Sequence, residues 1–135
     1  MHSKESSLES SHKSKSGLQR IARAMFYSVE GFRAALKHEH AFRQELLLCG
    51  VLLPFALWLP LLPMERAILI AALLLVLLVE LLNSAIEAVV DRVSLENHDL
   101  SKRAKDLGSA AVFLSLMIMA VTWGLIAGPA LARLL

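Results

Sequence analysis

The chain has 135 residues, of which 56% are hydrophobic and 19% are charged, and its formal net charge is +2. A chain this short and this apolar has no room for a separate soluble domain beside a membrane-embedded part. We therefore expect one all-α membrane domain over residues 17–135, in an oligomer of several chains. The single cysteine, Cys49, excludes an intrachain disulfide.

The first sixteen residues differ from the rest of the chain. They are rich in serine, mixed in charge and almost without apolar side chains. Such a segment cannot bury enough surface to offset the entropy lost on ordering, so we predict a disordered tail over residues 1–16. The segment also lacks the apolar stretch of a cleavable signal peptide. The first apolar run that follows is therefore predicted to remain as a membrane anchor.

Residues 17–38 have the pattern of an amphipathic helix. Apolar residues recur every three or four positions, and polar, mainly basic residues occupy much of the opposite side. The apolar positions are Leu18, Ile21, Met25, Val29, Phe32 and Leu36. A helix of this kind just before a span favours a position at the membrane surface, in the headgroup region. The alternative is a helix packed on the inner surface of the oligomer.

Three long apolar runs predict three transmembrane helices. Each run reaches or exceeds the roughly 17 to 25 residues that cross the hydrocarbon layer of a bilayer. The predicted spans cover about residues 42–62, 65–93 and 106–131. Pro54 can kink the first span, and Pro60 and Pro63 are expected to end it, which leaves a short turn before the second.

The lysines and arginines predict the orientation of the spans. Twelve of the fourteen lie either before the apolar stretch of the first span, which begins at residue 46, or between the apolar stretches of the second and third spans, from residue 91 to residue 106. By the positive-inside rule, these two segments face the cytoplasm. The N-terminus is therefore predicted to be cytoplasmic, and the C-terminus to face outward.

A stripe of polar side chains runs through the longest apolar run, residues 67–90. Glu80, Asn83, Glu87 and Asp91 are spaced by three, four and four residues, so they share one face of a helix. A charge at the bilayer centre costs roughly 2.5 to 17 kcal/mol, so glutamates kept at that depth indicate a function. By helical rise, Glu80 lies about 10 Å deeper than Glu87.

Carboxylates near the membrane surface suit Mg²⁺, which commonly takes one or two protein carboxylates and completes its shell with water and substrate phosphates. We therefore expect a shallow metal and nucleotide site beside a deeper base. Glu39, just before the first span, is a further candidate ligand at about the level of Glu87. The adjacent histidines, His38 and His40, point about 200° apart on a helix and are expected to have no ligand role.

The polar loop before the third span suits a bound phosphate compound. Lys105, beside Asp106, is suited either to contact a phosphate or to form a solvated rim. The chain contains no glycine-rich loop of the GxxxxGK[ST] type and no protein-kinase signature. Any nucleotide site must therefore be built in another way.

The chain contains three continuous blocks of motif residues: Glu39–Glu45 (EHAFRQE), Glu80–Arg92 (ELLNSAIEAVVDR) and Arg103–Val112 (RAKDLGSAAV). Together these blocks closely resemble the small bacterial integral-membrane diacylglycerol kinases of the Gram-negative type. The resemblance extends from about residue 20 to residue 123. In the surface helix the chain departs from the family, with Phe26 where glycine is common and Val29 and Glu30 where an aromatic and a basic residue are usual.

The resemblance implies an ATP-dependent kinase of the bacterial inner membrane that phosphorylates the free hydroxyl of diacylglycerol to give phosphatidic acid. It also implies a homotrimer with active sites shared between neighbouring chains. Glu80 would be the general base, with Asn83 beside the reacting groups, and Glu39 and Glu87 would hold Mg²⁺. The positions around ATP would be Arg20, Tyr27, Glu39, Glu87, Glu96, Asn97, His98, Lys105 and Asp106. The positions around the lipid would be Glu80, Arg43, Glu45, Ser109 and Trp123.

Two other functions remain open from the sequence. Undecaprenol kinases share the motif that contains Asn83 and Glu87, but they have a different version of the segment that follows Asp106. The pair Gly108 and Ser109 in this chain favours diacylglycerol as the substrate. A small proton-coupled transporter would use buried glutamates to load and release protons.

Overall fold

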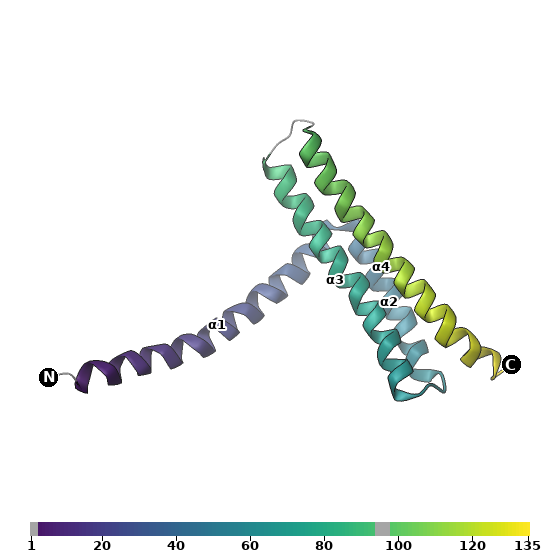
Figure 1. Cartoon of the computed structure of the whole chain (residues 1–135), viewed down its shortest axis with the longest axis horizontal. Helices are drawn as coiled ribbons and strands as arrows, with labels where there is room; N and C mark the ends of the chain where they lie inside the picture. Colours follow the sequence, from purple (N-terminus) through teal and green to yellow (C-terminus); the bar gives the residue numbers. More distant parts are fainter. Residues whose placement is uncertain (1–2, 94–97) are drawn as a thin grey trace. The chain divides into compact units, whose positions relative to one another are not determined.

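The computed structural model of the chain describes residues 3–93 and 98–135, with side chains from residue 17 onward. The described residues form four helices: α1 (Ser3–His38), α2 (His40–Trp58), α3 (Pro63–Val93) and α4 (Asp99–Ala132) (Figure 1). They separate into two compact units, one formed by α1 and the other beginning at Glu39 and extending to the C-terminus. The all-α class predicted from the sequence is confirmed.

The first helix is longer than predicted. We predicted a disordered tail over residues 1–16 and a helix from residue 17, whereas α1 begins at Ser3. The first proline of the chain is Pro54 and the first glycine is Gly17, so no strong helix breaker lies within the serine-rich segment. Extending a helix that has already formed costs far less than starting one, so the helix of residues 17–38 can continue toward the N-terminus.

The apolar stripe of α1 is exposed. Leu18, Met25 and Phe32 keep half or more of their surface accessible, while Glu30 and Arg33 form an ion pair of 2.6 Å. A continuous apolar surface of this kind is typical of a helix that meets a membrane or another protein. The predicted position at the membrane surface stays a prediction.

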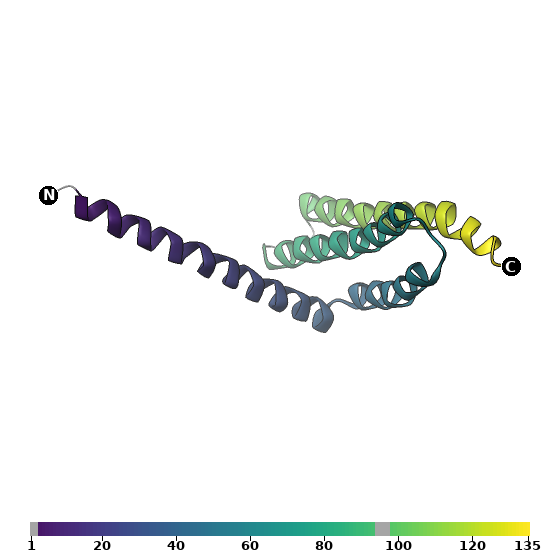
Figure 2. The same ribbon diagram turned by 90° about the horizontal axis from the view of Figure 1, so that it is seen from below.

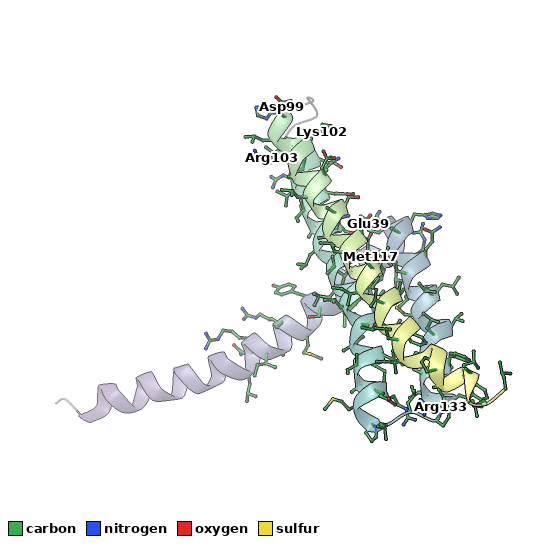
Figure 3. All side chains as sticks on the ribbon, turned by 45° about the vertical axis from the view of Figure 1, so that its right-hand side comes forward. Glu39, Asp99, Lys102, Arg103, Met117 and Arg133 are labelled. Carbon is green, nitrogen blue, oxygen red and sulfur yellow. The ribbon has the colours of Figure 1, made fainter. Side chains whose placement is uncertain are left out.

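Helices α2, α3 and α4 are each long and apolar enough to cross a membrane. Figure 3 shows the distribution of charge on α4, with Asp99, Lys102 and Arg103 at one end, Arg133 at the other and Met117 between them. Many large apolar side chains of the three helices are exposed, which suits surfaces that face lipid or other chains. The three predicted transmembrane helices are therefore confirmed as candidate spans.

Helix α3 lies beside both α2 and α4, and each neighbour runs antiparallel to it (Figures 1 and 2). The end of α3 therefore lies near the start of α4, which we call the α3–α4 end. The turn between α2 and α3 lies at the opposite end, which we call the α2–α3 end. The motif residues of α3 and α4 are thereby placed at the α3–α4 end.

The first span ends four residues earlier than predicted, at Trp58 rather than at residue 62. Leu59 has an extended backbone, with φ −62° and ψ 142°, because the ring of Pro60 disfavours the helical conformation in the residue before it. Helix α3 then begins at Pro63, a residue suited to the first helical position. The Glu65 carboxylate accepts a 2.9 Å hydrogen bond from the backbone N–H of Leu62 and so caps this start. Pro54 lies within α2, which continues past it.

Arg66 joins the two helices at the α2–α3 end. Its Nε donates to the carbonyl oxygen of Ala56 and its Nη2 to that of Leu59, each over 3.2 Å. These carbonyls are at the C-terminus of α2, where an α-helix leaves acceptors unpaired and where its dipole favours a cation. A buried apolar cluster lies at the same end: Ala56, Leu59, Leu61, Leu69, Ala127 and Ala130. Arg66 and this cluster thus hold the α2–α3 end together.

We predict that Arg66→Met lowers the free energy of unfolding by about 1.5–3 kcal/mol, the range for hydrogen bonds that involve a charged group. Thermal unfolding of the purified protein in detergent micelles measures this change. The control is Arg133→Met, because the side chain of Arg133, directly after α4, donates to the carbonyl oxygen of Pro129 of the same helix at an exposed position and joins no second helix among the described residues. The control is expected to change stability by less than about 0.5 kcal/mol. Equal losses in the two variants would contradict the proposed cap.

Candidate functional site

Polar side chains are buried in the middle of an otherwise apolar bundle. Glu80 and Asn83 of α3 and Glu45 of α2 are all buried, and only 3% of the Glu80 surface is exposed. The helical spacing of three residues places Glu80 and Asn83 on the same side of α3. Burial of ionisable groups within candidate spans is costly unless it serves a function. These three residues therefore form the centre of the candidate site.

Four carboxyl groups at this centre lie close enough for electrostatic repulsion between them. Glu87 and Glu39 repel a negative charge on Glu80, and Glu80 repels a negative charge on Glu45. Glu39 precedes α2 at its N-cap position, and its side chain makes no capping hydrogen bond with the described residues. The Glu39 carboxylate is thus not used to begin the helix. The structure brings the predicted base and both predicted metal ligands into one electrostatic cluster.

Asn83 is hydrogen-bonded to one of the two predicted metal ligands. Its Nδ2 donates a 3.2 Å hydrogen bond to Oε1 of Glu87, one helical turn along α3. Its Oδ1 is buried and has no hydrogen-bond partner among the described residues. The Oδ1 atom faces Gly108 of α4, where a Cβ atom would overlap it. Asn83 is therefore held between Glu87 and the backbone of the neighbouring helix.

Ion pairs connect and stabilise the α3–α4 end. The Nζ of Lys105 lies 2.5 Å from Oδ1 of Asp91, which joins α4 to α3. The Nζ of Lys102 lies 2.8 Å from Oδ2 of Asp106 within α4. His98 is the N-cap of α4, and its Nδ1 accepts a 3.2 Å hydrogen bond from the backbone N–H of Leu100. These pairs leave Lys105 and Asp106 partly accessible to a solute, since both pairs are on the surface.

Four predicted site residues belong either to α1 or to the segment outside the described residues. Glu96 and Asn97 are outside the described residues. Arg20 and Tyr27 are two turns apart on one face of α1, and both are exposed. Their predicted role at the nucleotide stays a prediction.

The residues predicted to contact the lipid are spread along the bundle. Arg43 and Ser109 are exposed and Glu45 is buried. Trp123 lies beside the apolar cluster of the α2–α3 end, about 21 Å along α4 from Ser109 by helical rise. The Nε1 of Trp123 is buried without a hydrogen-bond partner in the part of the chain that the structure describes. Ser109 and Trp123 are thus not brought together, and each can meet only a different part of a long lipid.

Two contacts at the site were not predicted from the sequence. Asp91, predicted only as part of the polar stripe, forms an ion pair with Lys105 of the neighbouring helix. Gly108, which served only to distinguish two kinase families, borders Asn83. The first contact depends on how α3 and α4 pack, for which the spacing within one helix carries no signal. The pair of Lys102 and Asp106 does have such a signal, the four-residue spacing on a helix.

Comparison with known proteins identifies the family of the chain. Residues 26–127 match the model of the family described as prokaryotic diacylglycerol kinase. The diacylglycerol kinase of Pseudomonas aeruginosa is 58% identical over 114 residues, which cover 84% of this chain and 93% of that protein. The diacylglycerol kinase of Escherichia coli K12 is 49% identical over 107 residues, covering 79% and 88%. That of Haemophilus influenzae is 45% identical over 108 residues, covering 80% and 92%.

Both the family match and these relatives span most of the chain, including the buried carboxylates, Asn83 and the start of α4. With its three candidate spans, the chain is a multi-pass membrane enzyme that belongs to the prokaryotic diacylglycerol kinase family.

Proposed function

We propose that this protein transfers the γ-phosphoryl group of ATP to the free hydroxyl of diacylglycerol, giving phosphatidic acid and ADP, at the cytoplasmic face of the bacterial inner membrane. The observation that carries the proposal is the buried Glu80, within a candidate span and surrounded by other carboxylates. A soluble substrate would not need a base at this depth, whereas the hydroxyl of a membrane lipid lies just below the headgroups. The names of the relatives support the same substrate.

Glu80 is proposed as the general base. Its carboxylate would take the proton of the lipid hydroxyl as the oxygen attacks the γ-phosphorus, and the bond between that phosphorus and the bridging oxygen of ADP would break. Phosphoryl transfer needs little covalent work from the protein beyond alignment and neutralisation of charge. Asn83, one turn away, would keep the surrounding carboxylates in place through its bond to Glu87.

Glu39 and Glu87 are proposed to hold the Mg²⁺ that accompanies ATP. The donor set fits this ion, because Mg²⁺ commonly takes only one or two protein carboxylates and fills its shell with water and phosphate oxygens. Among residues 17–93 and 98–135, whose side chains the structure describes, no group of three or more His, Cys, Asp or Glu side chains is arranged to hold a metal ion. When bound, the ion would neutralise charge on the phosphates. It would also relieve the repulsion that Glu80 experiences from Glu39 and Glu87.

The nucleotide is proposed to lie at the α3–α4 end. Lys105 is a partly accessible cation that Asp91 holds in place, and a phosphate group can take the place of one carboxylate oxygen at such a cation. Lys105, Asp106 and His98 are assigned to ATP by their positions in the family motif. The same resemblance assigns Arg20 and Tyr27 of α1 and the segment with Glu96 and Asn97.

The lipid is proposed to extend from Glu80 along the span. Ser109, Arg43 and Glu45 would lie near the glycerol and ester groups, and Trp123 near an acyl chain. The homotrimer with shared sites, the cytoplasmic N-terminus and the outward C-terminus are proposed from the resemblance and from the distribution of lysine and arginine. The exposed apolar side chains of all three spans are compatible with contacts to lipid and to other chains.

The first test measures ATP-dependent phosphorylation in mixed micelles with Mg²⁺, offering diacylglycerol and undecaprenol separately. We expect turnover of diacylglycerol, and loss of most turnover with retained ATP binding in Glu80→Gln, because glutamine cannot accept the proton. A matched control is Glu65→Gln, at the α2–α3 end, with near-normal turnover. Preference for undecaprenol would move the protein to the sister family, and near-normal turnover by Glu80→Gln would contradict the proposed base.

We also predict that Glu80→Gln makes the protein more stable while it removes turnover. The substitution replaces a buried carboxyl group that has other carboxylates near it with a neutral amide of the same shape, and a single stabilising substitution commonly adds about 0.5–2 kcal/mol. Thermal unfolding without nucleotide or metal measures the difference. Glu65→Gln should show no gain, because it weakens the cap on Leu62. A lower stability of Glu80→Gln would show that the carboxylate supports the fold.

For the proposed metal site, we predict that Glu39→Gln and Glu87→Gln each raise the Mg²⁺ concentration for half-maximal rate at least about tenfold, the order expected when support for a metal is lost. Glutamine has the same shape, and at position 87 it can still accept the bond from Asn83. Kinase rates over a Mg²⁺ titration, after removal of metal with EDTA, measure the effect. Asp99→Asn, an exposed acid at the start of α4, is the control. An unchanged Mg²⁺ requirement in both variants would exclude these ligands.

A further inference from the structure

Gly108 makes the closest approach of any glycine in the structure. A Cβ atom added at Gly108 would overlap Oδ1 of Asn83 and come within 3.3 Å of its Cγ. At each of the other five glycines, an added Cβ would meet nothing within 4 Å in the described parts of the chain. Gly108 is buried on α4, facing α3. Only hydrogen is small enough for this position.

The Asn83 side chain is fixed on its other side. Its Nδ2 donates to Oε1 of Glu87, so the NH₂ group of the amide faces Glu87. Oδ1 is then obliged to point toward Gly108. Because Asn83 is buried, its amide cannot swing into solvent without leaving Glu87.

We propose that Gly108 is a positioning residue, whose lack of a side chain holds the Asn83 amide in the orientation that keeps Glu87 in place. This inference rests on the proposed kinase site, since Glu87 is there assigned to the metal and Asn83 to the reacting groups. Gly108 itself touches no substrate. It acts through Asn83, which packs against its backbone.

A methyl group at Gly108 would therefore act on the chemical step. Asn83 would have to rotate, which breaks the bond to Glu87, or α4 would have to move away from α3. A displacement of about 1 Å at a reacting centre costs on the order of a hundredfold in rate. The contacts of ATP and diacylglycerol with their other residues would remain, so KM should change little.

The first experiment compares Gly108→Ala with Gly124→Ala, a helical glycine of the same α4 with open space at its Cβ position. We expect kcat to fall about tenfold to a hundredfold in Gly108→Ala, with KM for both substrates within about threefold. Gly124→Ala should keep kcat within about twofold. Normal kcat in Gly108→Ala would overturn the proposal.

The second experiment repeats Gly108→Ala in an Asn83→Ala background, where the colliding amide is absent. If Gly108 acts through Asn83, the second substitution adds no further loss to the residual kcat, whereas independent effects multiply. Melting temperatures from thermal unfolding provide a second double-mutant cycle, which does not depend on kinase activity. Gly108→Ala should lower the melting temperature in the native background and leave it unchanged or raised when Asn83 is alanine.

The results separate this inference from the proposed function. A native protein without turnover on diacylglycerol contradicts the function, while the stability cycle still tests whether Gly108 acts on Asn83. A native protein with turnover, combined with multiplying losses and equal melting shifts in both backgrounds, contradicts the role of Gly108. Losses of kcat and of melting temperature that occur only in the background that retains Asn83 support the positioning role of Gly108.

Discussion

The structure depends on keeping several carboxylates inside a bundle of membrane-spanning helices. Glu45, Glu80 and Asn83 are buried at about one level of the bundle, and the charge of Glu80 is felt by Glu45. In water these groups would be hydrated at little cost, but in a span each must be offset by nearby cations, hydrogen bonds or a bound ion. The bond from Asn83 to Glu87 and the pair of Lys105 with Asp91 each stabilise a further carboxylate of α3, nearer the α3–α4 end.

The two ends of the bundle differ in how they are held together. At the α2–α3 end, Arg66 pairs the last carbonyls of α2, and an apolar cluster packs around Leu69. From the middle of the bundle toward the α3–α4 end, polar groups replace this packing, and the carboxylates of Glu80 and Glu87 lie close enough to repel each other. An end that is firmly packed allows the opposite end to hold an arrangement that costs stability. Such a division is expected where a site must be ready for charge that arrives only with the substrate.

The sequence was sufficient for the class of fold and for the residues on one face of α3, because hydrophobic length and helical spacing are local properties. It was less successful at the ends of elements. The first span ends at Trp58, since Pro60 constrains Leu59, and α1 extends to Ser3, where composition alone suggested disorder. The contacts between helices could not be predicted from the sequence. The pairs of Asp91 with Lys105 and of Asn83 with Gly108 depend on the register between α3 and α4, which one sequence does not encode locally.

Of the four buried side-chain polar atoms without a hydrogen-bond partner among the described residues, three lie on α2 and α3 near Glu80, and the fourth, Nε1 of Trp123, lies on α4 beside the apolar cluster. Oε2 of Glu45, Oδ1 of Asn83 and Oγ of Ser84 are buried without a hydrogen-bond partner among the described residues. Each buried polar atom without a hydrogen-bond partner lowers the stability of the fold by about 1–3 kcal/mol. Because native proteins have few such atoms, three of them in one region need an explanation other than packing. Two of them are pure acceptors and the third is a hydroxyl, which together match a ligand that brings hydroxyl or water hydrogens. Their grouping beside Glu80 supports a site that is completed by its substrate, because the same atoms elsewhere in the span would only weaken the fold.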